Sequence, residues 1–482
     1  MMAKLLLTVL VALSLADEPV HTNETSYNNL DAYHEVNPYQ EYKSHPGLKS
    51  PIWQANKLDL DLVSLEPYLF LAAGFGDDTY SPYIFNATDL SLVYADPQYA
   101  NVFEVRAQEV DGETFLTFWH GVTRAGGQAD GYCVFFDSEY KLRYNITAKG
   151  EGITALAASQ EVQVTKDGSV LLTVYNPITH DLTALGADKE GKLMDSMFQE
   201  VDPKTGDIAF TWSAADHFKP ENAVVPYADS KFSVGGAGYD FFHINSVEKT
   251  KNGDYLVSSR HMSIITLISG KDGKPIWAAG GNNPAINEFS DLDNDTALDF
   301  AFQHHVRFLD DDETEITMFD NRMQGRGGIN CQGRCSRGLH IKIDADAKTA
   351  TLVKEYFHPG TNYSSGALGS YYTLDNSNVL VGWGLNPTIT EFTDDGKVAM
   401  DVQVSAAGNN LSELPHLVYR AYKMDWEGNP TWDPKVAGER TEDSRKNVRL
   451  YASWNGATKV ASWVVVRFPI RDWEGGRGGI YF

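Results

Sequence analysis

The stretch from Tyr239 to Arg322 decides the fold of this chain, because strand-like apolar runs alternate there with polar side chains. Its distinctive segments are Tyr239-Asp-Phe-Phe-His-Ile-Asn-Ser-Val247, Ser258-Ser-Arg-His261, Trp277-Ala-Ala-Gly-Gly281, Phe302-Gln-His-His-Val-Arg307 and Phe319-Asp-Asn-Arg322. Successive side chains of a strand point to opposite faces of a sheet, so a short strand can present a polar group on one face alone. The recurrence predicts a sheet protein in which remote strands direct polar groups towards one shared point.

Short strands separated by turn signals continue on both sides of this stretch. A charged turn followed by a strand recurs at Gly168, Gly253 and Asn378, at spacings near multiples of about 42 residues, which is close to the length of a four-stranded propeller blade. The pattern favours an all-β fold, a six-bladed β-propeller, over a sandwich. Expected strands include Tyr68–Ala72, Thr114–Trp119, Tyr132–Phe136, Val170–Tyr175, Tyr255–Ser258, Ile264–Ile268, Ile316–Phe319, Leu339–Ile343, Val379–Val381 and Ala461–Val466.

The two ends of the chain differ from this pattern. Residues 1–16 read as a signal peptide: Lys4 precedes the apolar run Leu5–Leu15, which is too short to span a bilayer, and we expect cleavage after Ala16. Residues 17–50 are polar and predict an extended N-terminal segment, followed by the propeller domain over 51–482. The Gly-rich run Asp472–Phe482 follows an expected strand at Val460–Arg467, so we expect a last strand that is unusual or cut short.

Composition excludes some classes of partner. The chain of 482 residues has a formal net charge of −25, which repels phosphate backbones and argues against nucleic-acid binding. No stretch after the leader approaches the roughly 20 apolar residues of a membrane helix, so we expect no stable membrane association. The oligomeric state stays open.

Sequons and cysteines point to a secreted glycoprotein. Cys331 and Cys335 could close a tight disulfide loop in an oxidising compartment, which would leave Cys133 as a buried free thiol. The sequence has neither zinc-ligand spacing, nor a nucleotide-binding loop, nor the glycine and glutamate that a calcium loop at Asp291 would need, so we expect no metal and no cofactor. The expected glycosylation sites are Asn23, Asn86, Asn145, Asn294, Asn362 and Asn410.

The histidines are the first candidates for chemistry. His243 and Asn245 share one face if both lie on a strand, whereas of the adjacent His304 and His305 only one can face a channel. A neutral imidazole can attack an electrophilic sulfur or phosphorus atom, and a neighbouring acceptor can fix its tautomer. The alternative is structural: a satisfied core residue at His243, and one buried and one exposed histidine at 304 and 305.

Arginines beside these histidines suit an anionic substrate. Arg322 follows Phe319-Asp-Asn, and a guanidinium offers a planar anion a fork of donors that stays charged at any working pH. Arg260, Arg307 and Arg326 compete for this role. The structural alternative for Arg322 is an ion pair at a strand end.

These segments, in this order, resemble the PAPS-independent arylsulfotransferase family in its fungal branch. The resemblance covers roughly residues 42–463 and includes Gln199-Glu-Val-Asp-Pro-Lys-Thr-Gly206 and Ser453-Trp-Asn-Gly-Ala-Thr458. It implies a six-bladed propeller whose central channel holds the site. Two departures stand out: Ala158-Ser-Gln-Glu161 replaces an expected Asp-x-His-Glu, and Trp277-Ala-Ala lacks an expected Arg-Leu.

The resemblance also assigns roles to residues. It implies a ping-pong reaction in which His304 becomes a sulfohistidine, with His243 as the other channel histidine and Arg322, or else Arg307, as the sulfate clamp. We expect the remaining substrate contacts from Asn245, Arg260, His305, Arg307 and Asn321.

The function expected from the sequence is therefore that of a secreted aryl sulfate:phenol sulfotransferase, with a small aromatic sulfate as donor and a phenol as acceptor. The alternatives are a non-catalytic secreted propeller that binds a small aromatic or glycan ligand, and a sulfate ester hydrolase.

Overall fold

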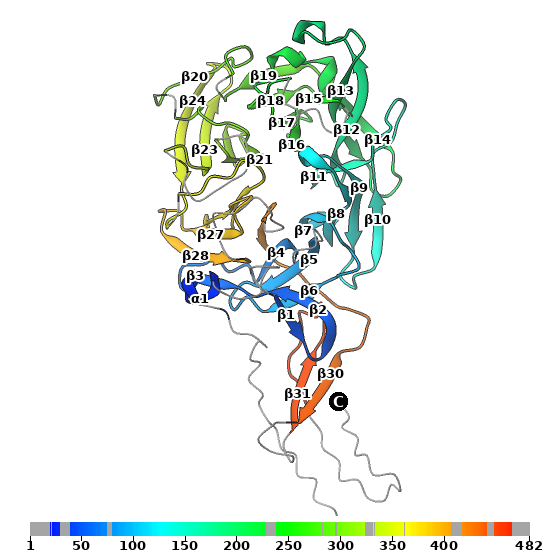
Figure 1. Cartoon of the computed structure of the whole chain (residues 1–482), viewed down its shortest axis with the longest axis vertical. Helices are drawn as coiled ribbons and strands as arrows, with labels where there is room; N and C mark the ends of the chain where they lie inside the picture. The colour runs from blue at the N-terminus through cyan, green and yellow to red at the C-terminus, as the bar shows by residue number, and fades with distance from the viewer. Residues whose placement is uncertain are drawn as a thin grey trace, which may run out of the picture.

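The fold is a closed ring of mainly antiparallel sheets in a propeller-like arrangement (Figure 1). The computed structural model describes residues 20, 22–28, 39–74, 80–227, 238–281, 283–294, 296–322, 331, 333–360, 362–405, 417–440 and 448–464. Within these ranges the helices are α1 (Glu24–Asn28) and four 3-10 turns at Ala125–Gly127, Thr183–Leu185, Ala214–Asp216 and Pro220–Asn222. No helix of the described part has the length and apolar character needed to cross a membrane. The all-β prediction is confirmed.

Four sheets have the size of a propeller blade. The first orders β29 (Tyr422–Met424), β4 (Tyr68–Gly74), β5 (Tyr80–Asn86) and β6 (Leu92–Ala95), and the second β16 (Ile244–Lys249), β17 (Tyr255–Ser259), β18 (Ile264–Ile268) and β19 (Pro275–Ala279). The third orders β20 (Ser290–Asp291), β24 (Thr349–Tyr356), β23 (Arg337–Asp344), β22 (Glu315–Asp320) and β21 (His304–Phe308). The fourth orders β25 (Ser370–Thr373), β26 (Val379–Gly382), β27 (Thr388–Phe392), β28 (Val398–Gln403) and β3 (Gln54–Leu58).

A single nine-stranded sheet occupies the rest of the ring. It contains β7 (Val102–Val110), β8 (Glu113–Thr123), β9 (Ala129–Phe136), β10 (Leu142–Ile146), β11 (Ala157–Val164), β12 (Val170–His180), β13 (Gly191–Val201), β14 (Ile208–Ser213) and β15 (Tyr239–Asp240). The structure therefore has four separate blade-sized sheets rather than the six expected. The expected separation fails because β11 pairs with β9 at one residue pair, Ala157 with Gly131, which joins two antiparallel runs into one sheet.

Both ends of the chain close the ring. Strand β29, from the C-terminal part of the chain, pairs with β4, and strand β3, from the N-terminal part, pairs with β28, so each completes a sheet built mainly from the opposite part of the sequence. The hairpins β1 (Tyr39–Tyr42) with β2 (His45–Pro51) and β30 (Lys435–Arg440) with β31 (Val448–Ser453) lie beside the ring, and the second projects from it (Figure 1).

Two expectations about the ends need correction, and one lies outside the described residues. Residues 17–50 were expected to be extended, but their described part contains α1 and the β1–β2 hairpin. The expected strand Ala461–Val466 is wrong over its described residues, since 461–464 form no strand and Trp463 and Val464 are exposed without a sheet to cover them. The signal peptide at 1–16 lies outside the described residues.

The order of the strands brings the predicted site residues to one end of the ring. Strands β7, β11, β16, β21 and β25 each begin a run of consecutive antiparallel strands. Each of them contacts the one that begins the next run: β7 contacts β11, β11 contacts β16, β16 contacts β21, and β21 contacts β25. In a run of four antiparallel strands, the link between the second and third strands lies at the same end as the link to the next run. Residues 241–243, 260–263, 301–303, 321–322 and 364–369 belong to such links, and Asp240 and His304 lie at the adjoining strand ends.

Tight backbone contacts hold these links in place. Gly281 has a φ of +62°, and a Cβ at this position would lie 1.5 Å from the carbonyl oxygen of Ser263. Ser263 in turn accepts the backbone N–H of Phe302 at its Oγ, 3.2 Å away. Gly281, in the link from β19 to His304, therefore allows that link to approach the β17–β18 link at Ser263.

We predict that Gly281→Ala destabilises the fold more than Gly253→Ala does. Both glycines have positive φ, but a Cβ at Gly253 meets no atom within 4 Å, so that variant isolates the backbone strain. The clash with Ser263 should add about 2 kcal/mol to the loss of unfolding free energy at Gly281. Urea unfolding of the two variants measures the difference, and equal losses would contradict the close approach.

Candidate active site

His304 is held in one tautomer by Asn321. The side-chain amide of Asn321 donates from Nδ2 to the carbonyl oxygens of Ser365 and Leu368, at 2.7 and 2.9 Å. Its Oδ1 must then face His304, where it accepts a hydrogen bond from Nδ1 at 2.7 Å. The lone pair of His304 consequently lies on Nε2, which accepts the backbone N–H of Leu368 at 3.1 Å.

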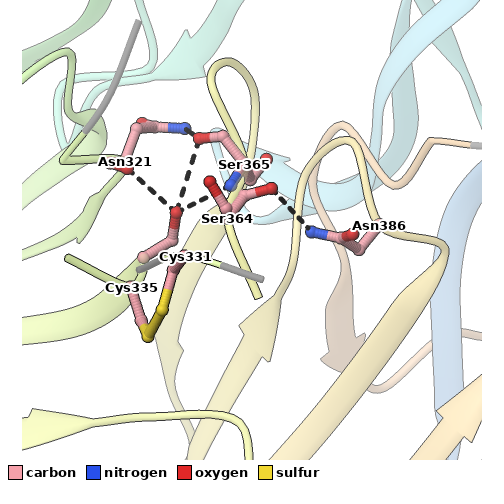
Figure 2. The surroundings of a disulfide bond; sticks show 7 residues. Asn321, Cys331, Cys335, Ser364, Ser365 and Asn386 are labelled. Atoms are coloured by element: carbon pink, nitrogen blue, oxygen red, sulfur yellow. Dashed lines mark hydrogen bonds between the residues drawn. A yellow bond between two sulfur atoms is a disulfide. The ribbon is translucent and has the colours of Figure 1, made fainter. Parts of the chain in front are cut away.

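The Cys331–Cys335 disulfide lies directly beside this amide (Figure 2). The structure bonds Cys331 to Cys335, with their Cα atoms 4.8 Å apart. The next residue, Ser336, donates from Oγ to the carbonyl oxygen of Asn321 at 2.9 Å and accepts the backbone N–H of Ser365 at 2.8 Å. The disulfide loop therefore ends at the hydroxyl that positions Asn321.

Burial and charge keep His304 neutral. The side chain is buried, and this burial, followed by the positive charge of Arg260, holds the pKa of His304 well below its ordinary value. A buried neutral imidazole with a defined lone pair is a nucleophile that needs no base to deprotonate it.

His243 forms a second buried centre with Asp240. His243 precedes β16, and its Nδ1 donates to Asp240 Oδ2 at 2.6 Å while its backbone N–H donates to Ser196 Oγ at 3.0 Å. Its φ of +56° breaks the alternation of strand side chains, so the expectation that Asn245 shares its face does not follow from the two-residue spacing. Asn245 lies within β16 and donates to the carbonyl oxygen of Gln303 at 2.5 Å, next to His304 in the chain.

Arg260 contacts the second histidine centre through His261, and its positive charge also lowers the pKa of buried His304. It donates from Nη1 to His261 Nε2 at 2.6 Å and from Nη2 to the carbonyl oxygen of Gly366 at 2.7 Å. The rings of His261 and His243 lie 4.5 Å apart between centroids. Burial lowers the pKa of the Arg260 guanidinium to about 10, so it remains charged at neutral pH.

Arg322 and Arg307 have other partners. Arg322 Nε lies 3.3 Å from Asp320 Oδ2 and its Nη2 lies 3.5 Å from Asp299 Oδ2, and Asp320 also binds Arg337. Arg307 pairs with Glu161 at 2.8 Å. Among the described contacts, neither guanidinium reaches His304 or His243. Arg326 lies outside the described residues.

His305 belongs to a different cluster from His304. Its Nε2 lies 3.3 Å from the hydroxyl of Tyr422, and burial followed by the charges of Arg420 and Arg307 holds its pKa well below the ordinary value. Both His304 and His305 are buried, so the structural alternative of one buried and one exposed histidine is wrong. The positive φ of His305 and the bulge between His304 and Arg307 allow both rings to turn inward.

A buried ionic cluster lies behind His305 and was missed in the sequence. Arg420 binds Glu104 at 2.9 Å and Glu161 at 3.1 Å, and it donates to the carbonyl oxygen of Asn245 at 2.7 Å. Arg106 lies 3.7 Å from Glu104 and donates to the carbonyl oxygen of Val162. The available signal was a charged residue inside an apolar run, as in Val102-Phe-Glu-Val-Arg106.

Gln160 stands at the position where the sequence departs from the expected histidine. Its Nε2 donates to the carbonyl oxygen of Gly127, and a Cβ at Gly127 would lie 3.5 Å from the His243 ring and 3.9 Å from Gln160 Nε2. The side chain therefore lies beside His243. An amide has no titrating proton, so Gln160 can orient a ligand but cannot act as a base.

Asp240, His243 and His261 form the group of ligand-type side chains that come closest together in the described part of the chain. Their ligand atoms lie within 4.8 Å of one another. Burial alone would raise the pKa of Asp240, but the two histidines outweigh it and hold that pKa well below its ordinary value. The Arg260 guanidinium at 2.6 Å from His261 opposes a second cation there, so we assign no metal to this group.

Comparison with known proteins gives one family. A family model described as Arylsulfotransferase (ASST) matches residues 106–405. Comparison with curated protein sequences gives no significant match.

Solved structures resemble the chain at low identity. One is a protein of unknown function from Bacteroides caccae, at 13% identity and a TM-score of 0.42, with 74% of this chain and 98% of that chain covered. A dihydro-heme d1 dehydrogenase, NirN, has 12% identity and a TM-score of 0.30, with 72% of this chain and 57% of that chain covered. The Dos1 propeller has 10% identity and a TM-score of 0.32, with 71% of this chain and 68% of that chain covered.

We predict that the protein loses stability as the pH falls from 7 to 5, in part through His261. Burial lowers the pKa of His261 from 6.5 to about 4. Between these values the unfolded chain takes up a proton that the folded protein refuses, so stability falls as the pH falls. His261→Gln keeps a donor and an acceptor and should reduce this loss by about 2 kcal/mol.

Urea unfolding at pH 7 and pH 5 measures the effect. The same substitution at His180, at the end of β12, serves as the matched control. An unchanged pH dependence in His261→Gln would show that His261 titrates normally in the folded protein.

Proposed function

Because the chain belongs to the arylsulfotransferase (ASST) family, we propose that it transfers a sulfuryl group from an aryl sulfate to a phenol through His304. The observation that carries this proposal is the Asn321 amide, which leaves the lone pair of a buried neutral imidazole on Nε2. The proposal departs from the sequence expectation in one residue: Arg260, rather than Arg322, binds the sulfate group.

In the first half-reaction His304 Nε2 attacks the sulfur atom of the donor. The new N–S bond forms as the S–O bond to the aromatic ring breaks, and the phenolate leaves. The imidazole gains positive charge, which the Nδ1–H hydrogen bond to Asn321 Oδ1 stabilises. In the second half-reaction the oxygen of the acceptor phenol attacks the same sulfur, and the N–S bond breaks to restore neutral His304.

The hydrogen bond from the backbone amide of Leu368 to His304 adds a step before the attack on sulfur. The N–H occupies the Nε2 lone pair at 3.1 Å, so this hydrogen bond must break before the attack on sulfur. The displaced N–H then lies near the transferring group, where a donor can stabilise charge on the equatorial oxygens. Leu368 has a φ of +64°, a conformation that a peptide rotation would relieve.

Arg260 and the Asp240–His243 pair supply the remaining chemistry. A guanidinium at this point neutralises the charge spread over the sulfuryl oxygens, as cationic donors do in phosphoryl transfer. His243 begins as an imidazolium stabilised by Asp240, gives its Nε2 proton to the departing phenolate, and regains a proton from the incoming phenol.

The proposal extends to the architecture and location expected from the sequence. The nine-stranded sheet contains two runs, β7–β10 and β11–β14, with β15 paired to β13, and we propose that each run corresponds to one blade of the expected six. Secretion, membership of the fungal branch and glycosylation are part of the same proposal. Of the sequon asparagines, Asn23, Asn145, Asn294 and Asn362 are exposed and Asn86 is half-buried, while Asn410 lies outside the described residues.

We predict that His304→Ala abolishes transfer. Incubation with 4-nitrophenyl sulfate should add the mass of one sulfuryl group to the wild-type protein and none to the variant, because the variant lacks the attacking nitrogen. His180→Ala is the matched control, since this half-buried histidine at the end of β12 has no described contact with His304 or His243.

The same assay with and without phenol separates the alternatives. Release of 4-nitrophenol that depends on phenol supports transfer, and release without phenol supports a hydrolase. Binding without any release supports a non-catalytic propeller. An adduct that persists in His304→Ala would place the nucleophile elsewhere.

We predict that Arg260→Met lowers the rate of the donor half-reaction by about two orders of magnitude, the usual effect of removing one charge-stabilising donor. Arg322→Met should have a smaller effect, because its guanidinium is occupied by Asp299 and Asp320. Stopped-flow release of 4-nitrophenol measures both. A larger loss of rate in Arg322→Met than in Arg260→Met would show that Arg322 binds the sulfate group.

A further inference from the structure

We propose that a cavity beside His243 binds a single-ring phenol and serves as the acceptor subsite, an assignment that rests on the proposed function. The cavity has a volume of about 210 Å³. A cavity of about 150 Å³ holds benzene in another protein, so one aromatic ring with a small substituent fits this space. Its main lining residues are Arg124, Gln128, Asp130, Tyr175, Pro177 and Met194.

An unsatisfied side chain points to a polar ligand. Gln128 is 4% exposed, and within the described part of the chain its Nε2 has no hydrogen-bond partner. A buried N–H donor without a partner destabilises a protein unless a ligand accepts from it. A phenol hydroxyl meets this demand, because its oxygen can accept a hydrogen bond from Nε2.

The walls favour a neutral aromatic ring over an anion. Tyr175, Pro177 and Met194 offer ring and aliphatic surface, and Tyr175 and Met194 pack together in one buried cluster. The cation at the mouth is already neutralised, since Arg124 Nη2 lies 2.5 Å from Asp130 Oδ2. The cavity therefore suits the uncharged acceptor better than the sulfate-bearing donor.

Two contacts connect the cavity to the reacting centre. The ring of Tyr175 lies 5.1 Å from that of His243, and its hydroxyl donates to the carbonyl oxygen of Ile244 at 2.6 Å. Gly127 precedes Gln128 in the chain and approaches the His243 ring. His243 does not line the cavity, so a phenol bound there lies near the histidine without contacting it.

The test combines direct binding with the two half-reactions. Calorimetric titration of the wild-type protein should show tighter binding of 4-methylphenol than of toluene. Gln128→Leu should weaken 4-methylphenol binding by about five- to tenfold and remove this preference. Ala155→Phe fills the cavity without removing a polar group and should abolish both signals. Gln98→Leu, at an exposed turn, is the matched control.

The kinetic arm distinguishes this inference from the proposed function. Ala155→Phe should raise the KM for 4-methylphenol at least about tenfold and leave the release of 4-nitrophenol in the donor half-reaction unchanged. Unaltered binding and KM in both variants, with transfer intact, would overturn the subsite and keep the function. Gln128-dependent binding without any transfer would keep the cavity as a phenol site and overturn its role as an acceptor subsite.

Discussion

The orientation of one amide group determines what His304 can do. Asn321 has a donor end and an acceptor end, and the carbonyl oxygens of Ser365 and Leu368 take the donor end. The acceptor end is then left for the imidazole, and the lone pair moves to the far nitrogen. A carboxylate at position 321 would place a negative charge beside the imidazole and favour its protonated form. An apolar side chain there would leave the tautomer of His304 undefined. The nearby disulfide and Ser336 matter because they hold this amide still.

The inner strands carry more buried charge than the chemistry requires. Arg420 joins Glu104 to Glu161 and reaches the backbone of Asn245. Removing one partner of such a pair leaves an uncompensated charge in a medium of low polarity, which costs about 3–5 kcal/mol. The cluster fixes strands from remote parts of the sequence at a common register. It also places positive charge behind His305, so its field reinforces the neutrality of both adjacent imidazoles.

Much of the local structure could be predicted from the sequence, because strand patterns are local. The strand Ile264–Ile268 lies where the apolar run places it. The union of β9 with β11 was not predictable, since it depends on a single contact between residues remote in sequence, Gly131 and Ala157. The tail strand failed for the opposite reason: its local sequence favours a strand, but no sheet covers the described residues Trp463 and Val464.

The candidate site followed a similar division. His243, His304, Asn321 and Arg260 could be selected as residue types in a recurring pattern. The ion pair of Arg322 with Asp320, two residues before it, was open as an alternative in the sequence, but choosing among the arginines needed the structure, because the second carboxylate, Asp299, is remote in sequence. Glu104 and Arg420 were invisible as a pair because 316 residues separate them. The side-chain alternation rule also failed at His243 and His305, where the backbone adopts positive φ.

The closure of the ring sets a condition on how the protein is made. Asn56 in β3 binds Asp401 in β28, which lies 345 positions later in the sequence. On the ribosome β3 therefore emerges long before its partner and stays an unpaired edge, and β4 lacks β29 for a similar time. Such edges invite pairing with other chains during synthesis. A newborn molecule of this kind depends on being shielded until its last strands have left the exit tunnel.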